Sequence, residues 1–253
     1  MSGAETSSLD DLREQVERLR AALTLQEAEA ADKEEQLQRY AADLRETFKE
    51  ERARAQELRE SYFATVRALT NAVEARDAYT GKHAERVAAY ALEIGATLGQ
   101  QWAGKPEIEF GFLLHDIGKV AVPDSILHKP EPLTTQERDL IELHPVTGWE
   151  IVRQVDFLGA ASDVVRHHHE RWDGDGYPDG LAAEDIPFTA RVFAVADTLD
   201  ALTTDRPYRP ASGFPEARAM VEDGRGTQFD PAVVDALASM SDEVFERIRT
   251  EIG

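Results

Sequence analysis

One apolar stretch carries an imidazole directly beside a carboxylate: Phe110-Gly111-Phe112-Leu113-Leu114-His115-Asp116-Ile117-Gly118-Lys119. The apolar run predicts a helix that ends at Gly118, because glycine commonly follows a helix C-terminus. His115 and Asp116 would then lie near the end of that helix and point about 100° apart, so they could contact one metal ion from two directions. A single His-Asp pair is more often a capped helix end than a metal site. Further candidate ligands elsewhere in the chain are therefore needed to indicate a metal site.

The composition describes an acidic chain without cysteine. Its 253 residues, 42% of them hydrophobic, allow one large domain with an appendage or two small domains. The net charge of −21 argues against a nucleic-acid groove and is typical of a well-solvated surface. The lack of cysteine excludes disulfides, thiolate zinc sites and thiol nucleophiles. No apolar run reaches the roughly 18 residues of a membrane helix, and the polar residues 1–10 are unlike a secretory signal, so we expect a cytoplasmic protein.

The first part of the chain predicts a coiled coil. We expect residues 1–8 to be disordered and residues 9–63 to form a dimerisation and signalling helix. Apolar residues with the spacing of a heptad seam support this expectation: Leu9, Leu12, Val16, Leu19, Leu23, Leu37, Tyr40 and Leu44. A lone helix of this length cannot bury such a stripe, so we expect a parallel homodimer. The alternative is a solvated single helix.

Residues 64–253 predict one all-helical domain, in which we find no convincing strand. Pro145 should help to begin the helix that runs to Val152, and Thr134 or Thr135 should cap the helix before it. Gly81 should interrupt the first helical stretch. We expect helices over residues 64–98, 106–118, 144–152, 160–170, 188–202, 214–223, 231–239 and 242–251.

This domain places seven side chains that commonly bind metals on otherwise apolar segments: His83, His115, Asp116, His144, His168, His169 and Asp197. Five imidazoles and two carboxylates suffice for two metal ions if Asp116 bridges them. Ligands of this kind, without sulfur, suit Fe, Mn, Ni, Co or Zn. Two ions about 3.5–4 Å apart polarise a phosphate and generate a hydroxide, which is typical of phosphoester hydrolysis. Lys119 could bind a phosphate oxygen or support the leaving group, or it could be an ordinary surface lysine.

Ordered motifs follow one another along the second part of the chain: His115-Asp116-Ile117-Gly118-Lys119, Val122-Pro123-Asp124-Ser125-Ile126-Leu127, Lys129-Pro130, His144, His168-His169-Glu170, Trp172-Asp173-Gly174-Asp175-Gly176-Tyr177-Pro178, Gly180-Leu181, Ile186-Pro187, Val195-Ala196-Asp197, Asp200-Ala201-Leu202, Arg206-Pro207-Tyr208-Arg209 and Phe229-Asp230-Pro231. Together they resemble an HD-GYP domain over roughly residues 64–245. The resemblance implies an all-α HD-superfamily helical bundle with a buried dinuclear metal centre, preceded here by the coiled-coil helix. It also implies a metal-dependent phosphodiesterase that opens the bacterial messenger cyclic di-GMP.

The resemblance also implies a role for each site residue. One metal would be held by His83, His115, Asp116 and Asp197. The second metal would be held by His144, His168 and His169, with Asp116 as the bridge. We expect two divalent ions, with Fe or Mn favoured and Ni, Co or Zn as alternatives.

Catalytic and substrate-binding roles come from the same resemblance. Lys119 would act on the scissile phosphate, with His115 and Asp116 as the catalytic metal ligands. The residues implied to contact substrate are Arg206 and Arg209, whose forked donors fit phosphate oxygens, and Tyr177, which would lie near the substrate or shape its loop. Side chains expected to stay outside the metal centre are His128, His167 and Trp172.

One position departs from the family pattern. The resemblance implies that family members with three metals carry a Glu one turn before the first His. This chain has Tyr79 at that position. We therefore expect two metals and a product that is mainly linear pGpG rather than GMP.

Two other functions stay open. The domain could be a catalytically silent module that binds cyclic di-GMP or a partner protein, although such a module would not need a complete ligand set. It could also be a related HD phosphohydrolase for another nucleotide, against which the Gly-Tyr-Pro and Arg-Pro-Tyr-Arg loops argue. The regulator would be either a separate sensor protein that docks on the coil or a missing part of a longer chain.

Overall fold

The computed structural model describes residues 3–76, 82–102, 104–205 and 210–252. The chain divides into two compact units, Met1–Ser61 and Tyr62–Gly253. The described residues form helices and contain no strand, apart from one isolated bridge between Arg225 and Phe229. The predicted all-α fold class is therefore confirmed. Within the described part of the chain, no helix combines the length and apolar composition needed to cross a membrane.

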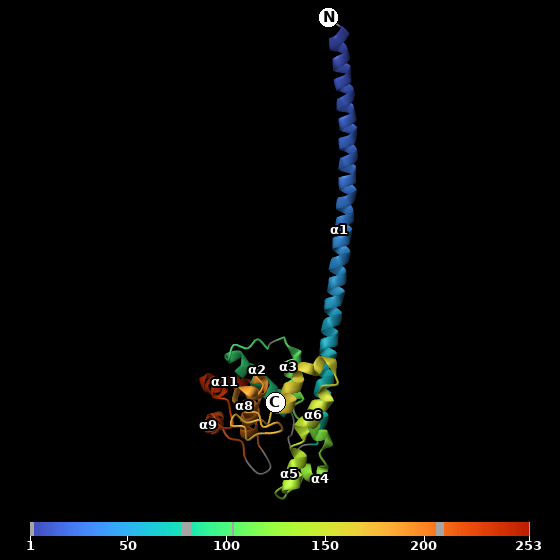
Figure 1. Ribbon diagram of the computed structural model, residues 1–253. Coiled ribbons are helices and arrows are strands. Elements are labelled where there is room, and N and C mark those ends of the chain that lie inside the picture. The colour runs from blue at the N-terminus through green and yellow to red at the C-terminus, as the bar shows by residue number, and fades with distance from the viewer. Residues whose placement is uncertain (1–2, 77–81, 103, 206–209, 253) are drawn as a thin grey trace. The chain divides into compact units, whose positions relative to one another are not determined.

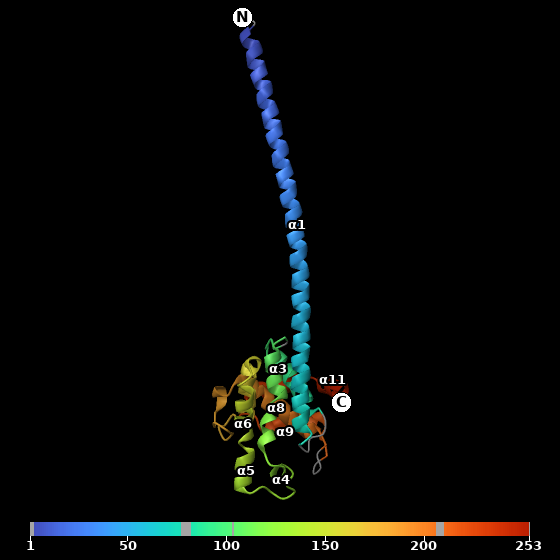
Figure 2. The same cartoon turned by 90° about the vertical axis from the view of Figure 1, so that its right-hand side faces the viewer.

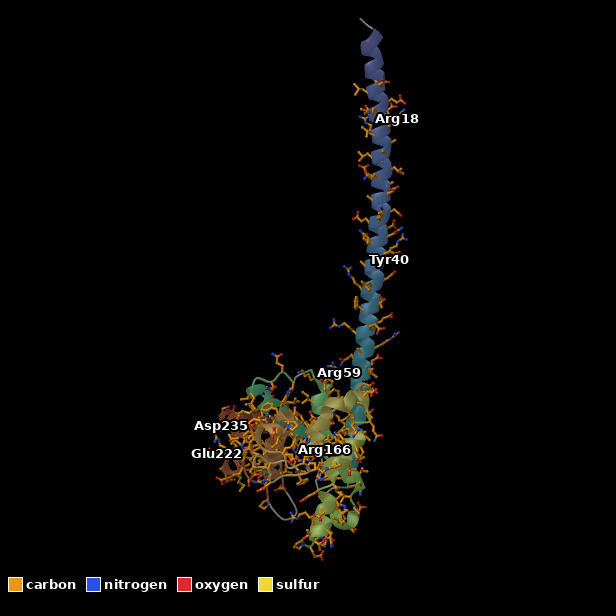
Figure 3. All side chains as sticks on the ribbon, viewed as in Figure 1. Arg18, Tyr40, Arg59, Arg166, Glu222 and Asp235 are labelled. Atoms are coloured by element: carbon orange, nitrogen blue, oxygen red, sulfur yellow. The ribbon has the colours of Figure 1, made fainter. Side chains whose placement is uncertain are left out.

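Helix α1 (Gly3–Glu74) is one long helix that forms the first unit and continues into the second. It begins before Leu9, where we expected the helical pattern to start. Within the first unit its large apolar side chains are exposed, among them Leu12, Val16, Leu19, Leu23, Leu37, Tyr40, Leu44 and Phe48. Figure 3 shows side chains around Arg18 and Tyr40 standing out from the helix. The long helix is confirmed, and its pairing with a second copy stays a prediction.

The second unit is a bundle of short helices around α2 (His83–Thr97) and α8 (Phe188–Thr203), which pack against each other. The other elements are α3 (Pro106–Leu113), η1 (Ile117–Ala121), α4 (Asp124–Leu127), α5 (Thr135–Ile141), α6 (His144–Val152), η2 (Asp156–Ala161), α7 (Ser162–His167), η3 (Ala183–Asp185), α9 (Phe214–Asp223), α10 (Pro231–Ser239) and α11 (Asp242–Ile252). The elements labelled η are 3₁₀ helices.

Aromatic side chains join these helices into one core. Phe112 of α3 stacks on Phe193 of α8, with ring centroids 5.6 Å apart. Tyr90 of α2 meets Phe245 of α11 edge to face at 5.2 Å. All four rings are buried, and each contributes roughly 1.5–3 kcal/mol by leaving water. The core thus fixes α2, α3 and α8 relative to one another, and these helices lead into or carry several of the candidate ligands.

The helix predicted to end at Gly118 is shorter than expected, and the predicted role of Gly118 is wrong. Helix α3 ends at Leu113, and η1 runs from Ile117 to Ala121, so Gly118 lies inside a 3₁₀ turn rather than after a helix. A Cβ atom at Gly118 would lie 1.9 Å from the backbone oxygen of His144. Glycine is therefore required because η1 and α6 touch backbone to backbone, which brings Asp116 next to His144.

Several other boundaries agree with the sequence. Helix α6 begins at His144 with Pro145 in its first turn. Thr134 caps α5 in a capping box, in which Thr134 and Glu137 bond each other's backbone N–H groups. The helix expected over residues 160–170 is instead divided, because η2 precedes α7 and α7 ends at His167.

Candidate metal centre

All seven candidate ligands lie in the second unit, and they gather from separate elements. His83 begins α2, His144 begins α6 and Asp197 lies in α8. His115 and Asp116 occupy the turn between α3 and η1, and His168 and His169 follow α7. Their ligand atoms form two groups, within each of which all atoms lie less than 4.8 Å apart. The first, the Asp116 group, is Asp116, His144, His168 and His169, and the second, the His83 group, is His83, His115 and Asp197.

Asp116 stands between the two groups. Its Oδ2 atom lies 3.1 Å from Nε2 of His115, a member of the His83 group. Its Oδ1 atom lies 3.2 Å from Nε2 of His144 and 3.9 Å from Nε2 of His168. Among the described residues, no donor is aligned to form a hydrogen bond with this buried Oδ1 atom. An ionised oxygen left in this state is a suitable ligand for a cation, and Asp116 can serve both groups.

Backbone carbonyl groups orient three of the imidazoles. Nδ1 of His115 lies 2.9 Å from the carbonyl oxygen of Phe112. Nδ1 of His144 lies 2.7 Å from that of Ile141, and Nδ1 of His168 lies 3.0 Å from that of Val165. In each case the acceptor is three residues earlier in the chain. A proton on Nδ1 leaves the lone pair of Nε2 directed into the centre, which is how metal-bound histidines are usually held. The donor set therefore fits metal binding.

His83 is oriented differently, by a carboxylate. Its Nδ1 atom lies 2.7 Å from Oδ2 of Asp200, and its Nε2 atom lies 3.3 Å from Oδ1 of Asp197. Asp200 is completely buried, and Arg86 donates two hydrogen bonds to it, from Nε at 2.7 Å and from Nη2 at 3.0 Å. The sequence reading missed both Asp200 and Arg86 as site residues. The one signal was the spacing of Asp197 and Asp200, three residues apart on one helical face.

The pKa values of the imidazoles differ between the groups. Burial, reinforced by neighbouring imidazoles, holds the pKa of His168 well below its usual value and lowers the pKa of His169 to about 4. Burial also opposes a charge on His83, but its hydrogen bonds to Asp197 and Asp200 prevail and raise its pKa to about 10. Without a cation, His168 and His169 are thus neutral at pH 7, whereas His83 holds a proton between two carboxylates.

Lys119 lies at the edge of the centre. Its Nζ atom is 2.8 Å from Oδ2 of Asp116. Burial disfavours the ionised form of Asp116, but Lys119 and His115 together hold the pKa of its carboxyl well below the usual range. The side chains of Asp116 and Asp197 are 21% and 29% exposed, although the Oδ1 atom of Asp116 is buried. The centre is therefore partly exposed beside Lys119.

The loop with the Gly-Tyr-Pro motif packs against the Asp116 group. The ring of Tyr177 stacks on His169, with centroids 4.8 Å apart. Buried Glu170 holds this loop by accepting hydrogen bonds from the backbone N–H groups of Asp179 and Leu181. A Cβ atom on Gly176 would lie 2.3 Å from the backbone nitrogen of Arg171, so the loop can fold this tightly only with glycine there.

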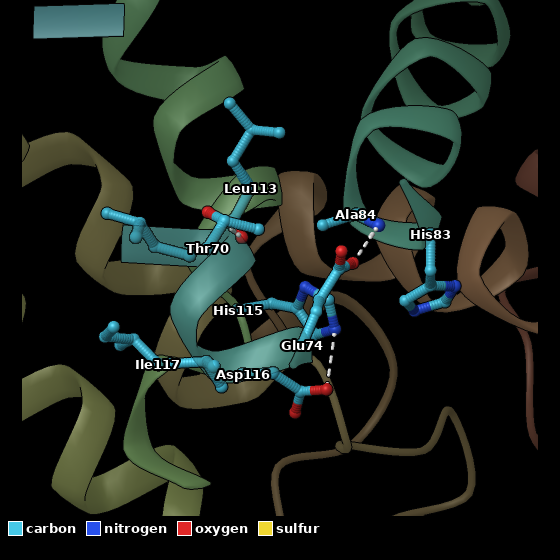
Figure 4. Close-up of a pocket in the computed structure, with 10 residues that line it drawn as sticks. Thr70, Glu74, His83, Ala84, Leu113, His115, Asp116 and Ile117 are labelled. Atoms are coloured by element: carbon cyan, nitrogen blue, oxygen red, sulfur yellow. Dashed lines mark hydrogen bonds and ion pairs between the residues drawn. The ribbon is translucent and has the colours of Figure 1, made fainter. Parts of the chain in front are cut away.

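The end of α1 and the turn that follows it form hydrogen bonds with the segments that carry the candidate ligands. Thr70 donates a hydrogen bond to the carbonyl of Leu113, and Glu74 accepts one from the N–H of Ala84, beside His83. Arg76 donates to the carbonyls of Val120 and Val122 at 2.9 and 3.0 Å. Figure 4 shows Thr70, Glu74, His115 and Asp116 among the residues that line one pocket. The sequence reading did not include Thr70, Glu74 or Arg76.

The remaining predicted residues lie apart from the ligand groups or outside the described residues. Nε2 of His167 lies 3.1 Å from Oδ2 of Asp179 rather than in the centre, and His128 is exposed. Trp172 packs in its loop beneath the guanidinium of Arg191, 5.8 Å from the ring centroid. Arg206, Arg209 and Tyr79 lie outside the described residues.

The chain is similar to known proteins along most of its second unit. An HD-domain family model matches residues 67–233. The chain is 42% identical over 183 residues to the cyclic di-GMP phosphodiesterase response regulator RpfG of Xanthomonas campestris, covering 72% of this chain and 48% of that protein. It is 38% identical over 198 residues to the 3'3'-cGAMP-specific phosphodiesterase 2 of Vibrio cholerae, covering 78% and 38%. The chain spans about half the length, or less, of these relatives.

Solved structures share the fold. A cyclic GMP-AMP specific phosphodiesterase of Vibrio cholerae superposes with a TM-score of 0.53 at 18% identity, covering 73% of this chain and 53% of that one. Bd1817, an HDG"Y"P protein from Bdellovibrio bacteriovorus, superposes with a TM-score of 0.53 at 20% identity, covering 71% and 63%. The predicted HD-superfamily fold and the family resemblance are thereby confirmed.

Proposed function

The chain belongs to the HD-domain family, and we propose that it is a metal-dependent phosphodiesterase that hydrolyses cyclic di-GMP in second-messenger signalling. The observation that carries the proposal is the junction of two ligand groups at Asp116, whose two carboxylate oxygens face different groups. Relatives named cyclic di-GMP phosphodiesterases, such as RpfG, support the choice of substrate.

We propose that the centre holds two divalent ions, Fe or Mn in preference to Ni, Co or Zn. The His83 group with Asp116 would hold one ion, and His144, His168 and His169 with Asp116 the other. Such ions polarise the scissile phosphate and lower the pKa of the attacking water. They also add positive charge to a chain of net charge −21, which otherwise repels a dianionic substrate.

The protein's own side chains would orient the substrate and neutralise its charge. Lys119 would donate from Nζ to a phosphate oxygen, which its 2.8 Å distance from Oδ2 of Asp116 supports. Tyr177 keeps His169 in place by stacking and would lie beside the bound nucleotide. Arg206 and Arg209, proposed to bind the outer phosphate oxygens, carry guanidinium groups suited to that contact. Their placement relies on the family resemblance.

We further propose that the main product is linear pGpG. The support is Tyr79, which stands where three-metal members of the family are expected to carry a carboxylate ligand. A neutral phenol is a poor ligand, and two ions suffice for one hydrolytic step. A third tightly bound ion, or GMP as the main product, would contradict this part of the proposal.

A second candidate substrate is 3'3'-cGAMP. The alignment with the 3'3'-cGAMP-specific enzyme of Vibrio cholerae covers 78% of this chain. The two cyclic dinucleotides differ in one base and not in their phosphates, so the metal centre cannot distinguish them. Comparing kcat/KM for both substrates would identify the preferred one.

Dimerisation through α1 is proposed as the way in which the enzyme is assembled and regulated. The exposed apolar stripe of α1 is what a parallel partner helix would cover. A separate sensor protein could act on this coil. We also retain the cytoplasmic location as a prediction, because the proposed substrate is an intracellular messenger.

The test is incubation of the purified, Mn-loaded or Fe-loaded chain with cyclic di-GMP, with the products resolved over time. We expect linear pGpG from the wild type and from the control Asp235→Ala, which removes only an exposed ion pair with Arg225. We expect no product from Asp116→Ala. Tight binding of cyclic di-GMP without turnover by the metal-loaded wild type would instead identify the silent binding module.

A further inference from the structure

A buried ion pair lies behind the ring of His83. Asp200 is 0% exposed and Arg86 is 5% exposed. Both carboxylate oxygens of Asp200 accept from the guanidinium, Oδ1 from Nε at 2.7 Å and Oδ2 from Nη2 at 3.0 Å. A buried pair of this kind adds little net stability, because desolvation of the two charges offsets their attraction. Its presence in the core therefore calls for a role other than stability.

The pair connects directly to a candidate ligand. Oδ2 of Asp200 lies 2.7 Å from Nδ1 of His83, although 117 residues separate the two in sequence. His115, His144 and His168 have backbone carbonyls as their Nδ1 acceptors, three residues earlier in each case. Of the ligand imidazoles whose Nδ1 acceptor is defined in the described residues, His83 alone depends on a side chain.

Helix α8 provides both partners of the His83 ring. Asp197 and Asp200 are three residues apart on α8, so they lie on one face of the helix. Asp197 faces Nε2 of His83 at 3.3 Å, and Asp200 faces Nδ1 at 2.7 Å. With the ring held between them, its tautomer and its direction are both determined by one helix.

We propose that Asp200, itself oriented by Arg86, is the positioning residue for His83: it keeps the proton on Nδ1 and so directs the Nε2 lone pair into the metal centre. This inference rests on the proposed metal-dependent function, and it assigns a role to two residues that touch neither the metal position nor the substrate. Loss of such a partner typically lowers metal affinity about 10–100-fold. The effect should be confined to the His83 group.

The experiment is Mn²⁺ titration of the metal-free full chain by calorimetry, with metal content measured after gel filtration. The main variant is Asp200→Leu/Arg86→Met, which replaces both charges by apolar groups of similar volume and leaves no buried charge unpaired. We expect this variant to keep one Mn²⁺ site at wild-type affinity and to bind the other about 10–100-fold more weakly. Asp200→Asn/Arg86→Met, which keeps a neutral acceptor, should lie between this variant and the wild type.

The matched control is Arg191→Met/Asp230→Asn. This change removes another pair with a buried carboxylate, in which Nη1 of Arg191 lies 2.6 Å from Oδ2 of Asp230, and it touches none of the ligands. It should leave both Mn²⁺ affinities unchanged. Circular dichroism and thermal unfolding confirm that each variant is folded.

Wild-type affinity at both sites in the folded Leu/Met variant would overturn the inference, as would a wild-type chain that binds only one Mn²⁺. If the Leu/Met variant does not fold, Asp200→Glu decides, since it keeps the charge but displaces the carboxylate. Selective weakening of one site then supports the inference, and unchanged affinities refute it. A wild type that binds two Mn²⁺ without hydrolysing cyclic di-GMP would end the proposed function and leave this inference intact.

Discussion

Around Asp116 the imidazoles are held by the backbone, whereas at His83 the imidazole is held by side chains. His144 and His168 meet carbonyl oxygens three residues earlier, at 2.7 and 3.0 Å. His83 instead lies between Asp197 and Asp200. The pKa values differ in the same way, because burial holds the pKa of His168 well below its usual value whereas the two carboxylates raise that of His83 to about 10.

This difference shows that the two groups are prepared for a cation in different ways. In the Asp116 group, His168 and His169 are neutral before a cation arrives, so they need lose no proton. In the His83 group, a proton occupies the place of the cation and must leave when the cation binds. A backbone anchor survives most substitutions, whereas a side-chain anchor can be removed by one.

The largest effect should come from removing the residue that the two groups share. Asp116→Ala deletes the carboxylate that faces His115 on one side and His144 on the other. We expect both metals to bind weakly and kcat/KM to fall by more than the ~100-fold loss that follows removal of a partner behind a ligand. Metal content and cyclic di-GMP turnover measure this. Retention of either metal at wild-type affinity would show that the groups are independent.

Removing Lys119 should separate chemistry from metal binding. Lys119→Met deletes the Nζ donor at the edge of the centre but none of the ligands. We expect kcat to fall about 100-fold, as for loss of one charged donor to a developing oxyanion, while both metals stay bound. Lys119→Arg, which keeps the charge, should recover part of the rate. Lost metal in the folded Met variant would mean that Lys119 acts by holding Asp116 rather than on substrate.

Gly118→Ala should disturb mainly the Asp116 group. The new Cβ atom would meet the backbone oxygen of His144 at 1.9 Å, which forces η1 away from α6. We expect a loss of about 1–3 kcal/mol in the free energy of unfolding, with weaker Mn²⁺ binding in the Asp116 group. Gly159→Ala is the matched control, because no atom lies within 4 Å of its added Cβ. Thermal unfolding with and without Mn²⁺ compares them.

The smallest effect is that of changing the pH by one unit, which acts through the proton on His83. Because the pKa of His83 is about 10, Mn²⁺ binding to the His83 group should release one proton and strengthen about tenfold per pH unit between pH 7 and 9. His168 and His169, neutral throughout this range, should release none. Calorimetry of His168→Ala and His83→Ala, in buffers of different ionisation enthalpy, counts the protons for each group. Equal proton release by the two variants would contradict the proposed difference in protonation between the His83 group and the Asp116 group.

Local patterns in the sequence predicted much of the fold. Helices α9 and α10 begin and end at the residues expected from the sequence, and Thr134 forms the expected cap. All seven candidate ligands gather in two groups. The predicted role of Gly118 was wrong because two situations place a glycine at such a position. A glycine can follow the end of a helix, or it can allow two backbone segments to lie in contact. The contact of Asp200 with His83 depends on how α8 packs on α2, which no local pattern contains.

Helix α1 is connected to the domain in a way that matters for how such proteins are recombined. Thr70, Glu74 and Arg76 bond the segments that carry His83, His115 and Lys119, and the ring of Tyr62 stacks on Phe157. One continuous helix therefore belongs to two compact units. A chimera that exchanges residues 1–61 would replace only the first unit, whereas one joined at residue 77 would remove the contacts that support the candidate metal ligands. The second unit, with all the candidate ligands, therefore begins in the middle of helix α1.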